Sequence, residues 1–120
     1  MSPEREALLA ARHPSYVAAQ LQDGASACGD GWFDVVDRLL TSLEARNLDG
    51  FKPIQIKQKM GKLRFYAFGL DDEAEAAIQA ASEESASICE SCGEPGMLGG
   101  GRWLSSRCEQ HRDPPEEEAE

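Results

Sequence analysis

Four residues near the C-terminus have the types and the spacing of a metal site. Cys89 and Cys92 form a C-x₂-C pair, and after fifteen residues Cys108 and His111 form a C-x₂-H pair. Three thiolates and one imidazole are ligands that Zn²⁺ binds in a closed tetrahedral site. Gly93 directly follows the first pair, where a tight turn often needs a positive φ. The spacing therefore predicts one structural Zn²⁺ ion.

Two alternatives for these residues stay open: four unrelated side chains, or one disulfide with a free thiol. A fourth cysteine, Cys28, lies outside the pattern, and we expect it to be a small buried apolar residue. Four protein ligands leave no position for a metal-bound water, so the site is expected to staple the fold and not to catalyse. The chain also lacks a Ser-His-Asp arrangement, a phosphate loop and an HExxH pattern. A non-enzymatic protein is therefore predicted, although the role of Cys28 is left open.

Composition sets the class of protein. The chain has 120 residues and a net charge of −10. No run of about 18 apolar residues occurs, so no membrane span or membrane partner is expected. The N-terminus lacks the pattern of a secretory signal, and the cysteines match a metal site, which together favour a reducing cytoplasm. We expect an α+β domain over residues 1–88, a zinc knuckle over 89–112 and an acidic disordered tail over 113–120.

The elements that must position these residues can be read from periodicity. Helices are predicted from Pro3 with Ser2 as the cap, over about 15–22, and over about 32–46 with Asp30 as the N-cap and Trp32 as the first of its core residues. A β-hairpin follows over about 54–68, with a turn at Gly61-Lys62. An alanine-rich helix after Asp71 leads into Cys89. Its small residues either pack inward or pair two copies of the chain, so a homodimer stays open.

Charge is distributed unevenly along the chain. Between residues 51 and 70 stand five of the twelve basic residues and no acidic one, so the rest carries seven basic against 22 acidic residues, or −15. This pattern predicts an acidic body around a basic hairpin, and it offers two surfaces for a partner. The acidic surface comprises Asp71, Asp72, Glu73, Glu75, Glu83 and Glu84. The basic surface comprises Lys57, Lys59, Arg64 and Tyr66, which could contact phosphates and stack on a base.

Three segments together resemble a group of small proteins encoded by tailed bacteriophages and prophages. They are CGDGWFD at 28–34, QKMGKLRFYAFG at 58–69 and CESCG…W…CEQH at 89–111. Lys62 departs from this pattern, since the relatives often have a small residue there. The resemblance covers about two thirds of the chain and implies a phage-type origin, the cytosol of a bacterial host and the same zinc module. It implies no activity, so it assigns no catalytic residue.

Two functions compete on these grounds. The first is an interaction protein whose acidic surface inhibits or modulates a host complex, such as a defence or nucleic-acid-processing assembly, through a basic protein surface. The alternative is a zinc-containing accessory or regulatory protein that binds nucleic acid with the basic hairpin. The net charge of −10 favours the first, because general nucleic-acid binders are basic.

Overall fold

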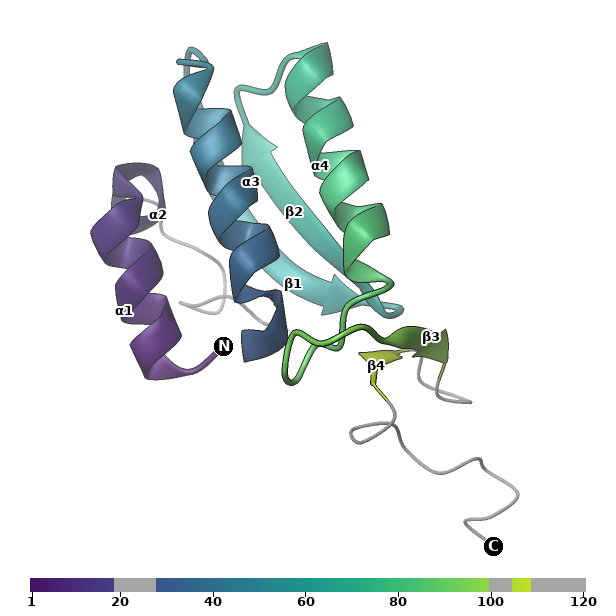
Figure 1. Ribbon diagram of the computed structural model, residues 1–120. Helices are drawn as coiled ribbons and strands as arrows, with labels where there is room; N and C mark the ends of the chain where they lie inside the picture. Colours follow the sequence, from purple (N-terminus) through teal and green to yellow (C-terminus); the bar gives the residue numbers. More distant parts are fainter. Residues whose placement is uncertain (19–27, 100–104, 109–120) are drawn as a thin grey trace, which may run out of the picture.

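The chain folds as an α+β domain in which helices cover one face of a two-stranded antiparallel hairpin (Figure 1). The computed structural model describes residues 1–18, 28–99 and 105–108. In chain order the elements are α1 (Pro3–Arg12), α2 (Pro14–Ala18), a short 3-10 helix η2 (Asp30–Trp32), α3 (Phe33–Ala45), β1 (Lys52–Lys59), β2 (Lys62–Phe68), α4 (Asp72–Ser85), β3 (Met97–Gly99) and β4 (Ser105–Arg107). The predicted fold class is confirmed.

The core forms where α3 meets the inner face of the hairpin. Six side chains of α3 are buried, at the helical spacing that the sequence predicts: Phe33, Val35, Val36, Leu39, Leu40 and Leu43. The hairpin contributes Ile56, Leu63 and Phe65, and α4 contributes its small residues Ala74 and Ala81. Small side chains let α4 approach both α3 and β2 closely. Burial of this apolar surface supplies the main driving force for folding.

The helix caps follow the predicted chemistry at two of three places. The Ser2 hydroxyl accepts from Arg5 N at the start of α1, and the Asp71 carboxylate accepts from Ala74 N at the start of α4. The prediction that Asp30 caps the core helix is wrong. Asp30 instead opens η2, and its Oδ1 accepts a hydrogen bond from Ser2 N at 2.7 Å. A tertiary contact with the N-terminus has replaced the local cap.

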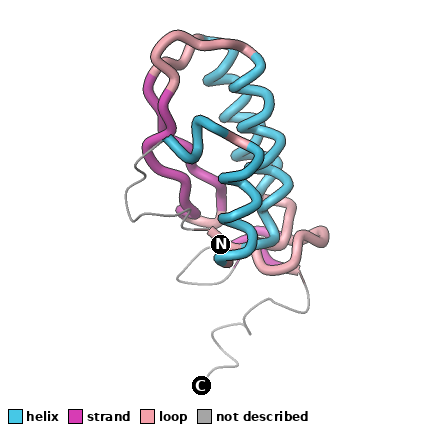
Figure 2. The backbone as a smooth tube through the Cα atoms, turned by 90° about the vertical axis from the view of Figure 1, so that its left-hand side faces the viewer, coloured by secondary structure: helices cyan, strands magenta, loops and turns pink. Residues whose placement is uncertain are grey.

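The hairpin has the predicted sidedness but a different turn. Strands β1 and β2 pair with Lys59 opposite Lys62, so the connecting residues are Met60 and Gly61 and not Gly61-Lys62. Both connecting residues have positive φ, 55° and 80°, as a type I′ turn requires. The register shifts between Pro53 and Gln55. Figure 2 shows the strands to one side of the helices, so one face of the hairpin is left uncovered by α3 and α4.

Several predictions fall wholly or partly outside the described residues. Of the second predicted helix, only Pro14–Ala18 is described, and it is helical. The acidic tail and the segment 100–104 are not described. Among the residues that are, no helix is long and apolar enough to cross a membrane.

Candidate metal centre and basic hairpin face

Three of the four predicted metal ligands meet in space. The Sγ atoms of Cys89, Cys92 and Cys108 lie within 4.8 Å of one another, and those of Cys92 and Cys108 are 3.7 Å apart. A disulfide would bring two sulfurs to about 2.05 Å. Two thiolates on one tetrahedral Zn²⁺, each at about 2.3 Å, lie about 3.8 Å apart. The three cysteines can therefore hold one metal ion, and none of them forms a disulfide among the described residues. His111, the predicted fourth ligand, lies outside the described residues.

Local backbone structure brings these sulfurs together. The first pair sits on a tight turn in which Cys89 N donates to Glu94 O at 2.7 Å and Gly93 N donates to Cys89 O at 2.9 Å. Gly93 has a φ of 83°, as its place after the second cysteine predicts. Strands β3 and β4 then pair with Met97 opposite Arg107, so the chain returns Cys108 to the first pair. The sequence analysis did not predict this small sheet.

The thiols of the cluster differ in their readiness to ionise. Burial opposes ionisation of Cys89, but backbone N–H groups of Cys108, Cys92 and Ser91 outweigh it and lower the pKa of Cys89 to about 6. At Cys92 the N–H of Glu94 favours the thiolate, yet desolvation and the two neighbouring thiols raise the pKa overall. Cys89 is therefore mostly a thiolate at neutral pH, and a bound cation would favour ionisation of the other two thiols.

The fourth cysteine plays a different part. Cys28 is buried in the hydrophobic core, as predicted. Burial, the largest cause, raises the pKa of its thiol to about 12. Cys28 thus stays protonated at neutral pH and packs as a small apolar residue.

A clamp of backbone contacts joins the metal turn to the start of the core helix. Gly31 N donates to Glu90 O at 2.7 Å, Gly29 N donates to Glu90 Oε2 at 2.9 Å, and Trp32 Nε1 donates to Ile88 O at 3.0 Å. We call residues 29–32 and 88–90 the clamp. A Cβ added at Gly31 would lie 2.1 Å from Cys89 O, so only glycine fits this approach. The cysteine cluster is consequently fixed to the main domain at two points, α4 and the clamp.

Sequence reasoning missed this role of the segment CGDGW. It interpreted Asp30 as a helix cap and Trp32 only as a core residue. The signal that could have found it is the pair of glycines two residues apart beside a tryptophan, which indicates close backbone approach. The N-terminus reinforces the same segment, because the Met1 amino group donates to Cys28 O. The hydrogen bond from Ser2 N, the largest cause, lowers the pKa of Asp30 and keeps its carboxylate ionised.

The outer surface of the hairpin gathers every basic residue of the stretch 51–70. Cross-strand pairs alternate between the core side and the outer side of the hairpin, and on the outer side Lys52, Lys59, Tyr66 and Phe68 are exposed while the other four residues are half-buried. Those directed outward are Lys52 with Phe68, Gln55 with Tyr66, Lys57 with Arg64, and Lys59 with Lys62. We call these eight residues the hairpin face. Two pairs set cations directly opposite each other, an arrangement that destabilises a sheet. None of the five cations forms an ion pair with a described residue, and Arg64 Nε is buried without a hydrogen-bond partner in the described structure.

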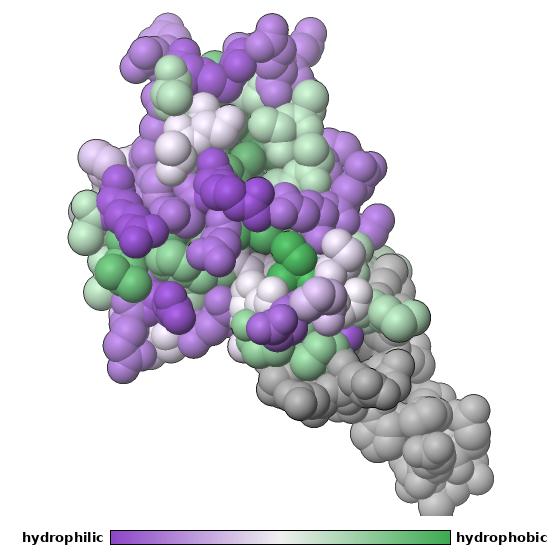
Figure 3. Space-filling view, in the orientation of Figure 1, coloured by the Kyte–Doolittle hydropathy of each residue, from purple (hydrophilic) through white to green (hydrophobic). Residues whose placement is uncertain are grey.

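Arginines on the helical side are placed differently. Arg46 pairs with Asp71 at 2.8 Å and with Glu73 at 3.0 Å, and Arg38 pairs with Glu84 at 2.6 Å. Three of the six residues predicted as an acidic partner surface are thus engaged by neighbouring arginines. Figure 3 looks onto the helical side, where hydrophilic side chains surround smaller apolar patches. Asp72, Glu75 and Glu83 are exposed and carry no ion pair with a described residue, so only half of the predicted acidic surface is left without a neighbouring arginine.

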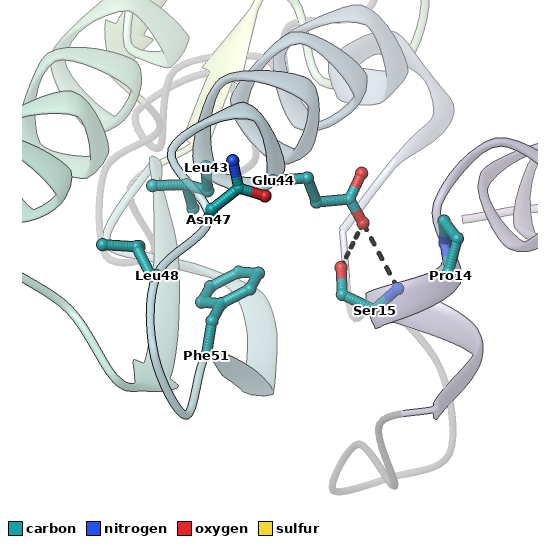
Figure 4. A pocket seen from close by; sticks show the side chains of 7 residues that line it. All are labelled: Pro14, Ser15, Leu43, Glu44, Asn47, Leu48 and Phe51. Atoms are coloured by element: carbon teal, nitrogen blue, oxygen red, sulfur yellow. Dashed lines mark hydrogen bonds between the residues drawn. The ribbon is translucent and has the colours of Figure 1, made fainter.

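The histidine outside the metal pattern is built into a closed network. His13 is 3% exposed, and its ring nitrogens lie 2.8 Å from Glu44 Oε1 and 2.7 Å from Asp37 Oδ1. The other Glu44 oxygen accepts from Ser15 N and from the Ser15 hydroxyl (Figure 4). A pocket of about 350 Å³ beside this network is walled by Leu43, Leu48 and Phe51. Because both Glu44 oxygens already accept hydrogen bonds, the network serves to dock α1 and α2 onto α3.

No family model, curated protein or solved structure matches the chain. The likeness to phage-encoded zinc proteins therefore stays a prediction from three sequence segments. Functional inference depends on two features of the molecule itself, the cysteine cluster and the hairpin face.

Proposed function

We propose that the protein is a non-enzymatic nucleic-acid-binding accessory protein, with a structural Zn²⁺ ion that holds its C-terminal segment. The hairpin face is the binding surface, and Lys52, Lys57, Lys59, Lys62 and Arg64 contact phosphates. This is the alternative of the two functions weighed from the sequence. The observation that carries it is a sheet face with five cations, none of them ion-paired within the described part of the chain, and two exposed aromatic rings.

Electrostatics supports this surface over the acidic one. Like charges directly opposite each other destabilise a sheet, so the pairs Lys57–Arg64 and Lys59–Lys62 do not contribute to the stability of the fold. A polyanion would relieve that repulsion and release its own counterions. All 22 acidic residues lie outside the stretch 51–70, so charge is distributed asymmetrically along the chain. Such a protein would meet a polyanion with one preferred face.

The metal supports the surface indirectly. Cys89, Cys92 and Cys108 supply three sulfurs, and His111 would complete a closed Zn²⁺ site without a position for water. Metal binding would fix the clamp and with it the start of α3, on which the hairpin packs. The ion contributes folding free energy, on the order of 10 kcal/mol of apparent binding energy in comparable small sites.

Binding at low salt tests the proposal. We expect fluorescence anisotropy to detect binding to labelled oligonucleotides, and log Kd to rise with log salt. Five phosphate contacts predict a slope of about 3.5 for a single strand, and the variant Lys57→Gln/Lys59→Gln/Arg64→Gln, with two contacts left, predicts about 1.4.

The matched control is Arg5→Gln/Arg12→Gln/Arg38→Gln, which removes the same charge from the helical side. It should bind like the unaltered protein. Equal losses in both triple variants would show that net charge, and not the hairpin face, governs binding. Absence of binding to every oligonucleotide at low salt would refute the proposed function.

A further inference from the structure

We propose that the ligand of the hairpin face is a single strand, whose bases stack on Tyr66 and Phe68. The inference rests on the proposed function and deepens it, since cations by themselves do not distinguish a single strand from a duplex. It starts from the exposure of the two rings. Phe68 is 64% exposed and Tyr66 is 44% exposed, although both belong to a strand whose other face is buried in the core.

Each ring has a cation beside it. Lys57 Nζ lies 5.7 Å from the centroid of the Tyr66 ring, and Lys52 is the cross-strand neighbour of Phe68. A nucleotide combines a flat base with one phosphate, so a ring paired with a cation matches both parts. Two such pairs occur on this short sheet face. The arrangement is a repeated nucleotide site and not a general basic patch.

The spacing of the rings fits an unstacked strand. Residues two apart on one face of a β-strand lie about 7 Å apart. Stacked bases rise about 3.4 Å each, so the two rings are separated by about twice the thickness of a base. One base fits between Tyr66 and Phe68, and its neighbours can cover the outer sides. A continuous base stack would have to open to be bound in this way.

A duplex offers no partner for these rings. Its base faces are covered by neighbouring base pairs, so only groove edges and phosphates are accessible. Two aromatic side chains would then remain exposed beside the cations, with their apolar surface unburied. A single strand buries them and satisfies the cations together. Strand β2 has seven residues and spans about 24 Å, which suits a site of roughly four nucleotides.

The experiment compares 12-mer oligo-dT, 12-mer oligo-U and a 12-base-pair duplex by anisotropy with the full metal-loaded chain. We expect both single strands to bind at least 10-fold more tightly than the duplex. Tyr66→Ala/Phe68→Ala should weaken single-strand binding roughly 10- to 100-fold and leave the duplex unaffected. Tyr66→Phe keeps the ring and should bind like the unaltered chain.

The matched control is Leu8→Ala/Met97→Ala, which removes two exposed apolar side chains that are not part of the hairpin face. It should not change binding. The inference would be overturned if the unaltered chain bound the duplex as tightly as the single strands, or more tightly. It would also be overturned if Tyr66→Ala/Phe68→Ala left single-strand binding unchanged. In both cases the hairpin cations could still bind nucleic acid, so the proposed function would stand. Loss of all binding in the unaltered chain would instead refute the proposed function. Preference for oligo-dT or oligo-U assigns the single strand to DNA or RNA, and either result supports stacking.

Discussion

The clamp makes a sharp prediction for the substitution Gly31→Ala. An added Cβ would lie 2.1 Å from Cys89 O, 2.5 Å from Gly93 N and 2.7 Å from Glu90 C. All three atoms belong to the backbone of the metal turn, so no side-chain rotation can relieve the clash. The turn must move away from η2, and the hydrogen bond from Gly31 N to Glu90 O, at 2.7 Å, must lengthen or break.

The expected cost follows from these two effects. Overpacking against a rigid neighbour costs about 1–3 kcal/mol. A buried backbone pair that loses its hydrogen bond costs about 1–3 kcal/mol more. We therefore expect Gly31→Ala to lower the free energy of unfolding by about 2–6 kcal/mol, and Tm by roughly 10 °C or more for a chain of this size. Zn²⁺ affinity should also fall, because the displaced turn carries Cys89 and Cys92.

The control is Gly50→Ala. Gly50 has a φ of 73° but no atom within 4 Å of an added Cβ, so it isolates backbone strain from steric clash. That strain should cost only about 1–2 kcal/mol. The assay is thermal unfolding by circular dichroism with and without a chelator, together with competition for Zn²⁺ by a chromophoric chelator. If Gly31→Ala matched Gly50→Ala in both Tm and Zn²⁺ affinity, the clamp would not couple the metal turn to the core.

Three further substitutions test other parts of the structure. Cys28 keeps its proton in the folded state up to a pKa of about 12, against 9.0 for an ordinary thiol, so its contribution to stability is present below pH 9 and is lost as pH rises toward 12. Cys28→Ala should remove this alkaline loss, which amounts to about 2 kcal/mol between pH 8 and pH 10.5 in urea unfolding. Met60→Asn should stabilise the hairpin by about 0.5–1 kcal/mol, because asparagine tolerates the positive φ of a type I′ turn. Met60→Val should destabilise the hairpin. The reverse order of the two variants in urea unfolding would contradict this turn type. His13→Leu leaves Asp37 and Glu44 facing an apolar group and should lower the free energy of unfolding by about 2–4 kcal/mol. Arg12→Gln should lower it by less than about 1 kcal/mol, because the Arg12 side chain is 51% exposed. Similar losses of stability in the two variants would mean that the network is not buried.

Much of the fold could be predicted because the signals are local. The buried positions of α3 recur at helical spacing, and strand alternation sorts Leu63 and Phe65 inward against Arg64 and Tyr66 outward. The caps at Ser2 and Asp71 were likewise correct, since a cap involves residues only a few positions apart. The turn was misplaced by one residue because Gly61 supplies only one of the two positive φ values that it needs.

The metal ligands and the charged surfaces show which features local sequence signals can predict and which they cannot. Paired cysteine spacing predicted three sulfurs that do converge, because two tight turns leave little choice of geometry. The contest between acidic and basic surfaces could not be decided from composition. Which charges neutralise one another is a property of the folded chain, in which Arg38 and Arg46 pair with carboxylates 25 to 46 residues away.

Spacing within short stretches of chain was enough to predict the main helices, the sidedness of the hairpin and the convergence of three cysteines. Three features became visible only in the folded chain: Gly29 to Trp32 clamp the metal turn, two carboxylates enclose His13, and the hairpin cations have no ion pair with a described residue. These are contacts between residues far apart in sequence. Their energies depend on distance and burial, and neither quantity exists until the chain has folded.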